Sequence, residues 1–199
     1  MAIKPILFNT EMIRAILDER KSCTRRLISS RQFLGMLPDK CKNAAPDEFL
    51  KGKRMMFKPY CDMTDAELIM TAYKAPYEPG DILYVREAWK KAPNGYFYYE
   101  DWQRNDIADV TKWKPSIYMP KDAARIWLKV TDVRVERLQD MTDDDAEAEG
   151  CFDYTSTALG FFDVWDSTIK KSDLDRYGWN ANPWVWVIKF ERCEKPEGV

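Results

Sequence analysis

The chain has 199 residues, a formal net charge of -2 and no histidine. Its 45% hydrophobic and 14% aromatic residues suffice for one folded domain over residues 1–199 and exclude a largely disordered chain. The first 60 residues hold thirteen Lys and Arg against six Asp and Glu, while the remainder is acidic. This distribution excludes a uniformly basic nucleic-acid coat, but it allows a local basic surface.

Neither a membrane span nor a signal peptide is expected, because no apolar run approaches about 20 residues and the first residues lack an apolar stretch. We therefore expect a cytoplasmic protein. The five cysteines are widely spaced, without a CxxC pair, and with no histidine present we expect no metal site and no cofactor. Acid–base chemistry would have to use Lys, Glu, Asp, Tyr or Cys.

The first third of the chain predicts a strand, a helix and a second extended segment. Residues 3–8 form the strand, and 9–20 form a helix with apolar residues at helical spacing and an N-cap at Asn9 or Thr10. Residues 21–28 are expected to be extended. An irregular insertion follows at about 28–75, where charges are scattered and periodicity is weak.

Turn residues organise the middle of the chain. Pro79, Gly80 and Asp81 predict a turn into a strand over 82–87, and the Asn94-Gly95 pair predicts a hairpin. Residues 100–120 are expected to form a long loop that carries two tryptophans.

The longest predicted strand covers residues 124–138. Its apolar residues lie at even-numbered positions up to Val130 and at odd-numbered positions from Val133, and this change at Thr131-Asp132 predicts a β-bulge. The remaining predicted elements are a helix capped by Thr142 and ended by Gly150, a helix over 159–171, and a strand over 182–193 that begins near Pro183. Twisted strands with short helices and no βαβ rhythm predict an α+β fold, a small β-barrel rather than a Rossmann-type sheet.

The segment ERKSCTRRL at residues 19–27 is the first candidate site. A nucleophile there would be activated by Lys21 as base, whose neutral form is favoured by repulsion from the neighbouring cations. The candidate nucleophiles are Thr24, Ser22 and Cys23, and the cations are Arg20, Arg25 and Arg26. The alternative is an exposed basic strand. In a regular strand positions 21 and 24 point to opposite faces, so they converge only if the chain bends.

Two acidic residues are further candidates. Glu149 ends a predicted helix and faces the negative end of its dipole, which favours the protonated form that a general acid needs. Its alternative role is a solvated acid. Glu87 ends the strand over 82–87, beside Arg86, and we expect it to pair with an arginine of a neighbouring strand.

A cation–aromatic stripe occupies one face of the longest strand. Arg125, Trp127 and Lys129 alternate with apolar residues, a pattern suited to stacking a base and holding phosphate. The alternative is that Trp127 lies under an insertion, with the two cations extending at its edge.

The ordered segments ERKSCTRR, PGDILYVRE, LQDMTDDDAEAEG and WVWVIKFERC together resemble the ASCH-domain family, which has a PUA-like fold. Lys21, Ser22, Thr24 and Arg26 match its Gly-x-Lys-Thr/Ser-x-Thr/Glu-x-Arg segment, whereas Glu19 replaces the usual glycine. The C-terminal segment from Trp165 to Cys193 looks like ASCH-type proteins of tailed phages and prophages.

The resemblance implies a PUA-like small β-barrel with flanking short helices. It also implies binding of RNA, single-stranded nucleic acid or a modified nucleoside, in a cleft between residues 21–26 and the helix ending at Glu149. One branch of the family hydrolyses the amide of N4-acetylcytidine, and by position its catalytic roles fall on Lys21, Thr24 and Glu149. A nuclease, and a phage protein that binds a host protein through the insertion, remain alternatives.

Overall fold

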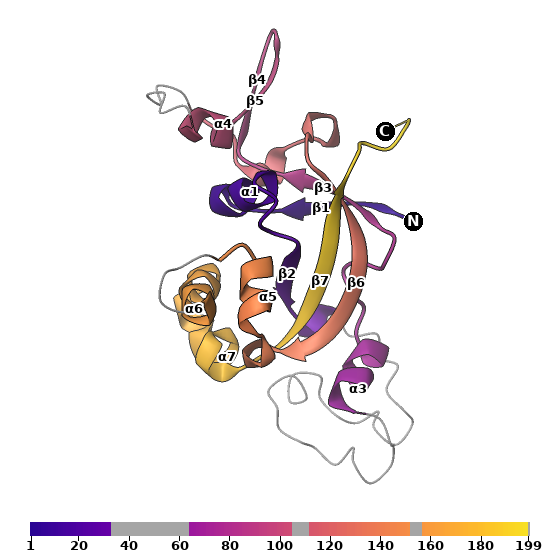
Figure 1. Cartoon of the computed structure of the whole chain (residues 1–199), viewed down its shortest axis with the longest axis vertical. Helices are drawn as coiled ribbons and strands as arrows, with labels where there is room; N and C mark the ends of the chain where they lie inside the picture. Colours follow the sequence, from indigo (N-terminus) through magenta and orange to yellow (C-terminus); the bar gives the residue numbers. More distant parts are fainter. Residues whose placement is uncertain (33–63, 105–111, 152–156, 199) are drawn as a thin grey trace.

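The computed structural model describes residues 1–32, 64–104, 112–151 and 157–198 (Figure 1). Most of the predicted insertion, residues 33–63, therefore lies outside the described residues. Of its remainder, Ser30–Gln32 forms a 3-10 turn and α3 covers Asp65–Ala72. No helix in the described ranges is both long and apolar enough to cross a bilayer.

Five strands form one mixed sheet in the order β1-β3-β6-β7-β2. β1 pairs with β3 in parallel, and every other pairing is antiparallel. The strands are β1 (Ile3–Leu7), β2 (Cys23–Leu27), β3 (Ile82–Arg86), β6 (Trp127–Arg137) and β7 (Trp184–Cys193). The α+β class is thereby confirmed.

The described strands do not close into a barrel, so that part of the prediction is not confirmed. β1 and β2 are the two edges of the sheet, and within the described chain no backbone ladder joins them. They nevertheless approach each other, because the Arg26 guanidinium on β2 donates to the Leu7 carbonyl at the end of β1 at 2.9 Å. A side chain thus spans the seam between the two edges.

The long strand has the predicted bulge. Its register against β7 shifts between Val130 and Asp132, and both strands bend along their length (Figure 1). Because the bulge adds one residue to the strand, the inward-facing positions change from even-numbered to odd-numbered residues. Val130 and Val133 are therefore both buried.

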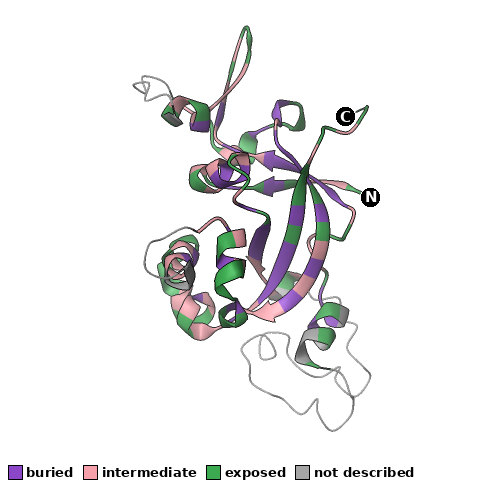
Figure 2. Ribbon diagram, viewed as in Figure 1, coloured by how far each residue is buried: buried purple, intermediate pink, exposed green. Residues whose placement is uncertain are grey.

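Short helices cover the two faces of the sheet. α1 (Thr10–Leu17) and α3 pack with the sheet around one large apolar cluster that contains Ile13, Ile69 and the fully buried Trp186. On the other side, α5 (Asp143–Ala148) and α6 (Thr157–Thr168) share a second cluster with β2 and β7, and α7 (Leu174–Tyr177) follows α6 (Figure 2).

A hairpin of β4 (Trp89–Ala92) and β5 (Gly95–Tyr98) extends beyond the sheet, turning at the predicted Asn94-Gly95 pair. The predicted loop over 100–120 is wrong at its start, because α4 (Tyr99–Arg104) directly follows β5. Contacts distant in sequence stabilise this short helix: its Glu100 pairs with Arg14 of α1 at 2.8 Å, and Tyr99 packs on Trp113.

Two helices end in the same capping turn. After α1, Arg20 N–H donates to the Ala15 carbonyl and Glu19 has a left-handed φ of 59°. After α5, Cys151 N–H donates to the Ala146 carbonyl and Gly150 has a φ of 87°. A Cβ at Gly150 would lie 2.7 Å from the Ala15 Cβ, so the two helix ends are in direct contact.

Candidate functional site

The junction of these two helix ends positions Lys21. Its backbone N–H donates to the Ala15 carbonyl at 3.1 Å, and the next N–H, of Ser22, donates to the Ala148 carbonyl at 2.8 Å. Lys21 thus lies before β2, in the bend between the two helix ends, and its side chain turns toward α5.

Lys21 and Glu149 form a buried ion pair. The Lys21 Nζ lies 2.7 Å from Glu149 Oε2 and also donates to the Glu149 backbone carbonyl at 2.8 Å. Their side chains are 0% and 2% exposed, respectively. The Phe8 ring, with its centroid 5.5 Å from Nζ, closes another side of the ammonium. Two residues 128 positions apart in sequence are therefore brought together, although neither is open to solvent.

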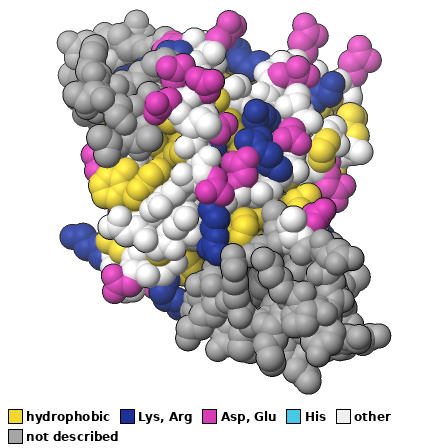
Figure 3. Space-filling view, turned by 60° about the horizontal axis from the view of Figure 1, so that its bottom comes forward, with side chains coloured by type: hydrophobic (Ala, Val, Ile, Leu, Met, Phe, Trp, Pro, Cys, Tyr) yellow, Lys and Arg dark blue, Asp and Glu magenta, His cyan; other side chains and the backbone are white. Residues whose placement is uncertain are grey.

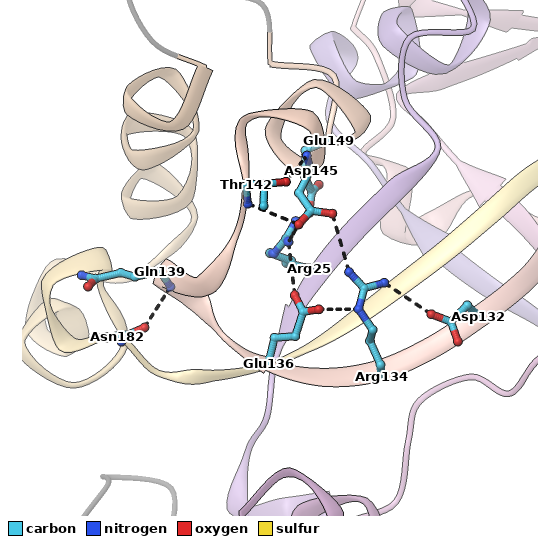
Figure 4. A network of polar contacts seen from close by, with 9 residues as sticks. All are labelled: Arg25, Asp132, Arg134, Glu136, Gln139, Thr142, Asp145, Glu149 and Asn182. Atoms are coloured by element: carbon cyan, nitrogen blue, oxygen red, sulfur yellow. Dashed lines mark hydrogen bonds and ion pairs between the residues drawn. The ribbon is translucent and has the colours of Figure 1, made fainter.

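Arg25 contacts the other carboxylate oxygen. Its guanidinium lies 3.4 Å from Glu149 Oε1, 3.3 Å from Asp145 and 3.5 Å from Glu136 (Figure 4). Its side chain is 0% exposed, and among the described residues its Nε has no hydrogen-bond partner. Arg25 is thus placed to hold Glu149 rather than to bind an external anion.

The network continues to the surface through Arg134. This side chain pairs with Glu136, with Asp132 at 3.3 Å and with Asp145 at 3.6 Å (Figure 4). Burial alone would lower the pKa of Arg134, but its bonds to Glu136 and the neighbouring carboxylates raise it above the ordinary value. Burial would likewise raise the pKa of Asp145, but the Thr142 backbone hydrogen bond and the two arginines lower it.

The candidate nucleophiles differ in their surroundings. Thr24 is 2% exposed, and within the described chain no hydrogen bond links its hydroxyl to Lys21 or Glu149. Cys23 is buried among apolar residues, and burial, followed by the charge of Glu149, raises its pKa to about 12. Cys23 is therefore held as a neutral thiol. Ser22 is exposed.

The remaining cations of residues 19–27, Arg20 and Arg26, lie outside the network around Glu149. Arg20 pairs with Asp18 at 3.2 Å on the surface. Arg26 spans the sheet seam over the Phe8 ring, 5.3 Å from its centroid, and burial lowers its pKa. The segment is therefore neither an exposed basic strand nor a cluster of free cations.

A cavity of about 400 Å³ lies against the Lys21–Glu149 pair, between α1, the end of α5 and α6. Its lining is Asn9, Glu11, Met12, Ala15, Glu149, Gly150, Cys151, Gly160 and Val164. Sequence reasoning identified only Glu149 in this set. The helical spacing of Met12 and Ala15 indicates one face of α1, but nothing in the sequence indicates that α6 faces it.

The other predicted site residues form a separate group. Glu87 accepts two hydrogen bonds from Arg125, each at 2.9 Å, as expected for a cross-strand partner. Burial raises the pKa of Glu87, and Arg125 counteracts this. Trp127 is 2% exposed and donates to the Ala124 carbonyl, which favours the alternative of a covered tryptophan, while Lys129 is exposed near Glu191. The proposed stripe is thus not a free stacking surface.

Metal ligation is not supported by the arrangement of the residues in the described ranges: no group of three or more His, Cys, Asp or Glu is placed to hold an ion. Of the two acidic residues that line the cavity, Glu11 and Glu149, the latter is paired with Lys21 and Arg25. The groups offered to a ligand are hydrogen-bond acceptors, backbone atoms and apolar side chains.

These features define an α+β protein with a curled mixed sheet and a cavity beside a buried Lys–Glu pair. No family model and no curated protein matches the chain. Among solved structures, the chain is similar to an ASCH domain from Lactobacillus crispatus, at 11% identity and a TM-score of 0.44, over 96% of this chain and 79% of that one.

Proposed function

We propose that the cavity beside Glu149 binds a nucleoside, or a single nucleotide of RNA or single-stranded DNA. The observation that carries this proposal is that Glu149, whose carboxylate lies 2.7 Å from the Lys21 Nζ, lines a cavity of about 400 Å³. That volume lies in the range of small-molecule sites, which is roughly 300–1,000 Å³.

The lining of the cavity suits a nucleobase. Met12 and Val164 offer apolar surface to the faces of a ring, while Asn9 and Glu149 offer polar groups to its edge. A carboxylate accepts about four hydrogen bonds, so Glu149 retains acceptor capacity beyond its bonds to Lys21 and Arg25. A carboxylate acceptor favours a base with an exocyclic amine, such as cytosine.

Titration calorimetry with cytidine, N4-acetylcytidine, uridine and adenosine tests this proposal. Val164→Trp fills the cavity and should abolish binding, whereas Asp163→Trp, at the adjacent exposed position of α6, is the matched control and should leave it unchanged. Absence of binding by any nucleoside, or equal loss in both variants, would refute a nucleoside site in this cavity.

Amide hydrolysis is a second candidate, favoured by the short Lys21–Glu149 contact. Transfer of one proton across this 2.7 Å contact yields a neutral amine base and a protonated acid together. The Thr24 oxygen would then bond to the acyl carbon while its proton passes to Lys21. The C–N bond would break as Glu149 protonates the leaving amine, and water would hydrolyse the resulting ester.

Acetate release from N4-acetylcytidine tests the hydrolase candidate separately from binding. Thr24→Val keeps the shape of the side chain but removes its hydroxyl, so it should abolish release while cytidine still binds. Release that is absent in the wild type, or unchanged in Thr24→Val, would eliminate Thr24 catalysis and leave the binding proposal intact.

We also infer membership of the ASCH-domain family from the motif at residues 19–27, and a phage- or prophage-type protein from the segment Trp165 to Cys193. We expect this protein to be a single domain that acts in the cytoplasm. A host-protein partner bound through residues 33–63 is the competing proposal. Deletion of 33–63 should leave nucleoside binding intact under the first proposal and abolish co-purification of a partner under the second.

A further inference from the structure

A second surface stands out by its concentration of lysines. The β4–β5 hairpin pairs with a following segment through Trp89 and Lys114, whose backbones exchange hydrogen bonds of 3.2 and 2.9 Å. We call residues 88–98 and 112–121 together the basic arm. Its base lies beside α1, and its hairpin points away from α5 and α6 (Figure 1).

Two lysines of the basic arm contact aromatic rings. The Lys114 Nζ lies 5.0 Å from the centroid of the Trp89 ring, and the Lys91 Nζ lies 5.6 Å from that of Tyr96. The five lysines of the arm are Lys90, Lys91, Lys112, Lys114 and Lys121. Within the described residues, none of them forms an ion pair with a carboxylate.

The cations near the cavity are paired with carboxylates instead. Lys21, Arg25 and Arg134 are each matched by at least one carboxylate within 3.6 Å. On the face shown in Figure 3, Lys and Arg side chains are interspersed with Asp and Glu. The basic arm is thus a place where positive charge is left available to an external anion.

Exposed apolar side chains adjoin this charge. At the end of the arm, Ile117 is 59% exposed and Tyr118 is 72% exposed. Arg86 connects them to the sheet: its guanidinium donates to the Ile117 carbonyl at 3.2 Å and lies 5.4 Å from the centroid of the Tyr84 ring. Tyr118 lies between Lys114 and Lys121 in the sequence, so this segment offers both an exposed ring for stacking and cations for phosphates.

We propose that the basic arm binds single-stranded nucleic acid, with its lysines on the phosphates and Tyr118 stacked on a base. This deepens the proposed function and rests on it, since the strand held by the arm would present one nucleotide to the cavity. Arg86, which donates to the Ile117 carbonyl of the arm, is the register partner of Leu7, and Asn9, two residues further on, lines the cavity.

Charge and stacking make separable contributions to this binding. Each phosphate contact on a single strand contributes about 0.7 to the slope of log K against log salt. Loss of three contacts should therefore reduce the slope by about 2 and weaken binding about 100-fold at 0.1 M salt. Loss of one stacked base should weaken binding about tenfold or more with the slope unchanged.

The experiment measures binding of a fluorescent 12-nucleotide RNA and a matching single-stranded DNA, by anisotropy, across salt concentrations. The arm variant combines Lys90→Gln, Lys91→Gln and Lys114→Gln. The control variant combines Lys170→Gln, Lys171→Gln and Lys189→Gln, three exposed lysines outside the arm with the same change of net charge. Tyr118→Ala reports stacking, and cytidine binding by each variant reports the cavity.

The proposal expects the arm variant to lose affinity and slope, Tyr118→Ala to lose affinity alone, and the control variant to behave as wild type. Equal loss in the arm and control variants would overturn it, as would a 12-mer that binds no more tightly than cytidine. Displacement of the RNA by an equal charge concentration of poly-glutamate would overturn it in favour of an acidic protein partner. If cytidine fails to bind while the 12-mer behaves as expected, the cavity proposal falls and the arm stands.

Discussion

Breaking the buried Lys21–Glu149 pair should cost more stability than removing both charges together. Glu149→Gln leaves the Lys21 ammonium, which is 0% exposed, with neutral oxygens as its hydrogen-bond acceptors. Removal of one partner of a buried pair typically costs about 3–5 kcal/mol, because the remaining charge is uncompensated. We expect Glu149→Gln to lie at the upper end of this range.

Lys21→Met should cost less, about 3 kcal/mol, because Glu149 keeps Arg25 at 3.4 Å. The double variant removes both charges, and Arg25 retains Asp145 and Glu136. Its free energy of unfolding should therefore exceed that of Glu149→Gln alone, which requires a coupling energy between the two positions larger than the cost of Lys21→Met, above about 3 kcal/mol.

Equilibrium unfolding in urea at pH 7, followed by tryptophan fluorescence, measures all three variants. Asp18→Asn, which breaks the surface pair with Arg20, is the control and should change stability by less than about 1 kcal/mol. If Glu149→Gln costs no more than this control, the pair is not effectively desolvated and the reasoning fails. If a single variant does not fold, recovery of folding in the double variant still shows that breaking the pair costs more stability than removing both charges.

Glu19→Gly should stabilise the protein by about 0.5–1 kcal/mol, because Glu19 is exposed with φ 59°, where only glycine avoids strain; a lower melting temperature would contradict this. Asp81→Asn should destabilise at neutral pH: burial would raise the pKa of Asp81, but bonds from Lys4, Ala2 and Glu78 lower it. The wild-type advantage should therefore be complete above the ordinary pKa of 3.8 and disappear as the pH falls through the lowered value, which acid unfolding of both proteins measures. Burial raises the pKa of the Cys151 thiol to about 11 and that of the Cys23 thiol to about 12. Iodoacetamide labelling of the native protein at pH 8, measured by peptide mapping, should therefore be slow at Cys151 and absent at Cys23. Rapid labelling of Cys23 would refute its burial.

Local signals in the sequence predicted local structure well. The bulge near Asp132, the cap at Thr142 and the stop at Gly150 each depend on residues within one turn or one strand, and each is confirmed. The start of α4 was missed because its stabilising contacts come from Arg14 and Trp113, which are distant in sequence.

The candidate site was only partly predictable. The juxtaposition of Lys21 with Glu149 followed from the family resemblance, because no spacing rule relates positions so far apart. The carboxylates around Arg25 were not foreseen, since they come from β6 and α5 and meet only when β2 packs beneath α5. For the same reason Trp127 was considered for a binding surface: alternation shows which side chains share a face, but not that another segment covers that face.

The contact between Gly150 and Ala15 couples the shape of the cavity to the spacing of the ion pair. Gly150 and Ala15 both line the cavity. Glu149 directly precedes Gly150, and the backbone N–H of Lys21 donates a hydrogen bond to the Ala15 carbonyl. A methyl group at position 150 would meet Ala15 at 2.7 Å and Lys21 at 3.2 Å, and it would force α5 away from α1. Enlarging the cavity by separating these helices would therefore lengthen the Lys21–Glu149 bond as well, so a change of ligand size in this fold would have to come from the α6 wall.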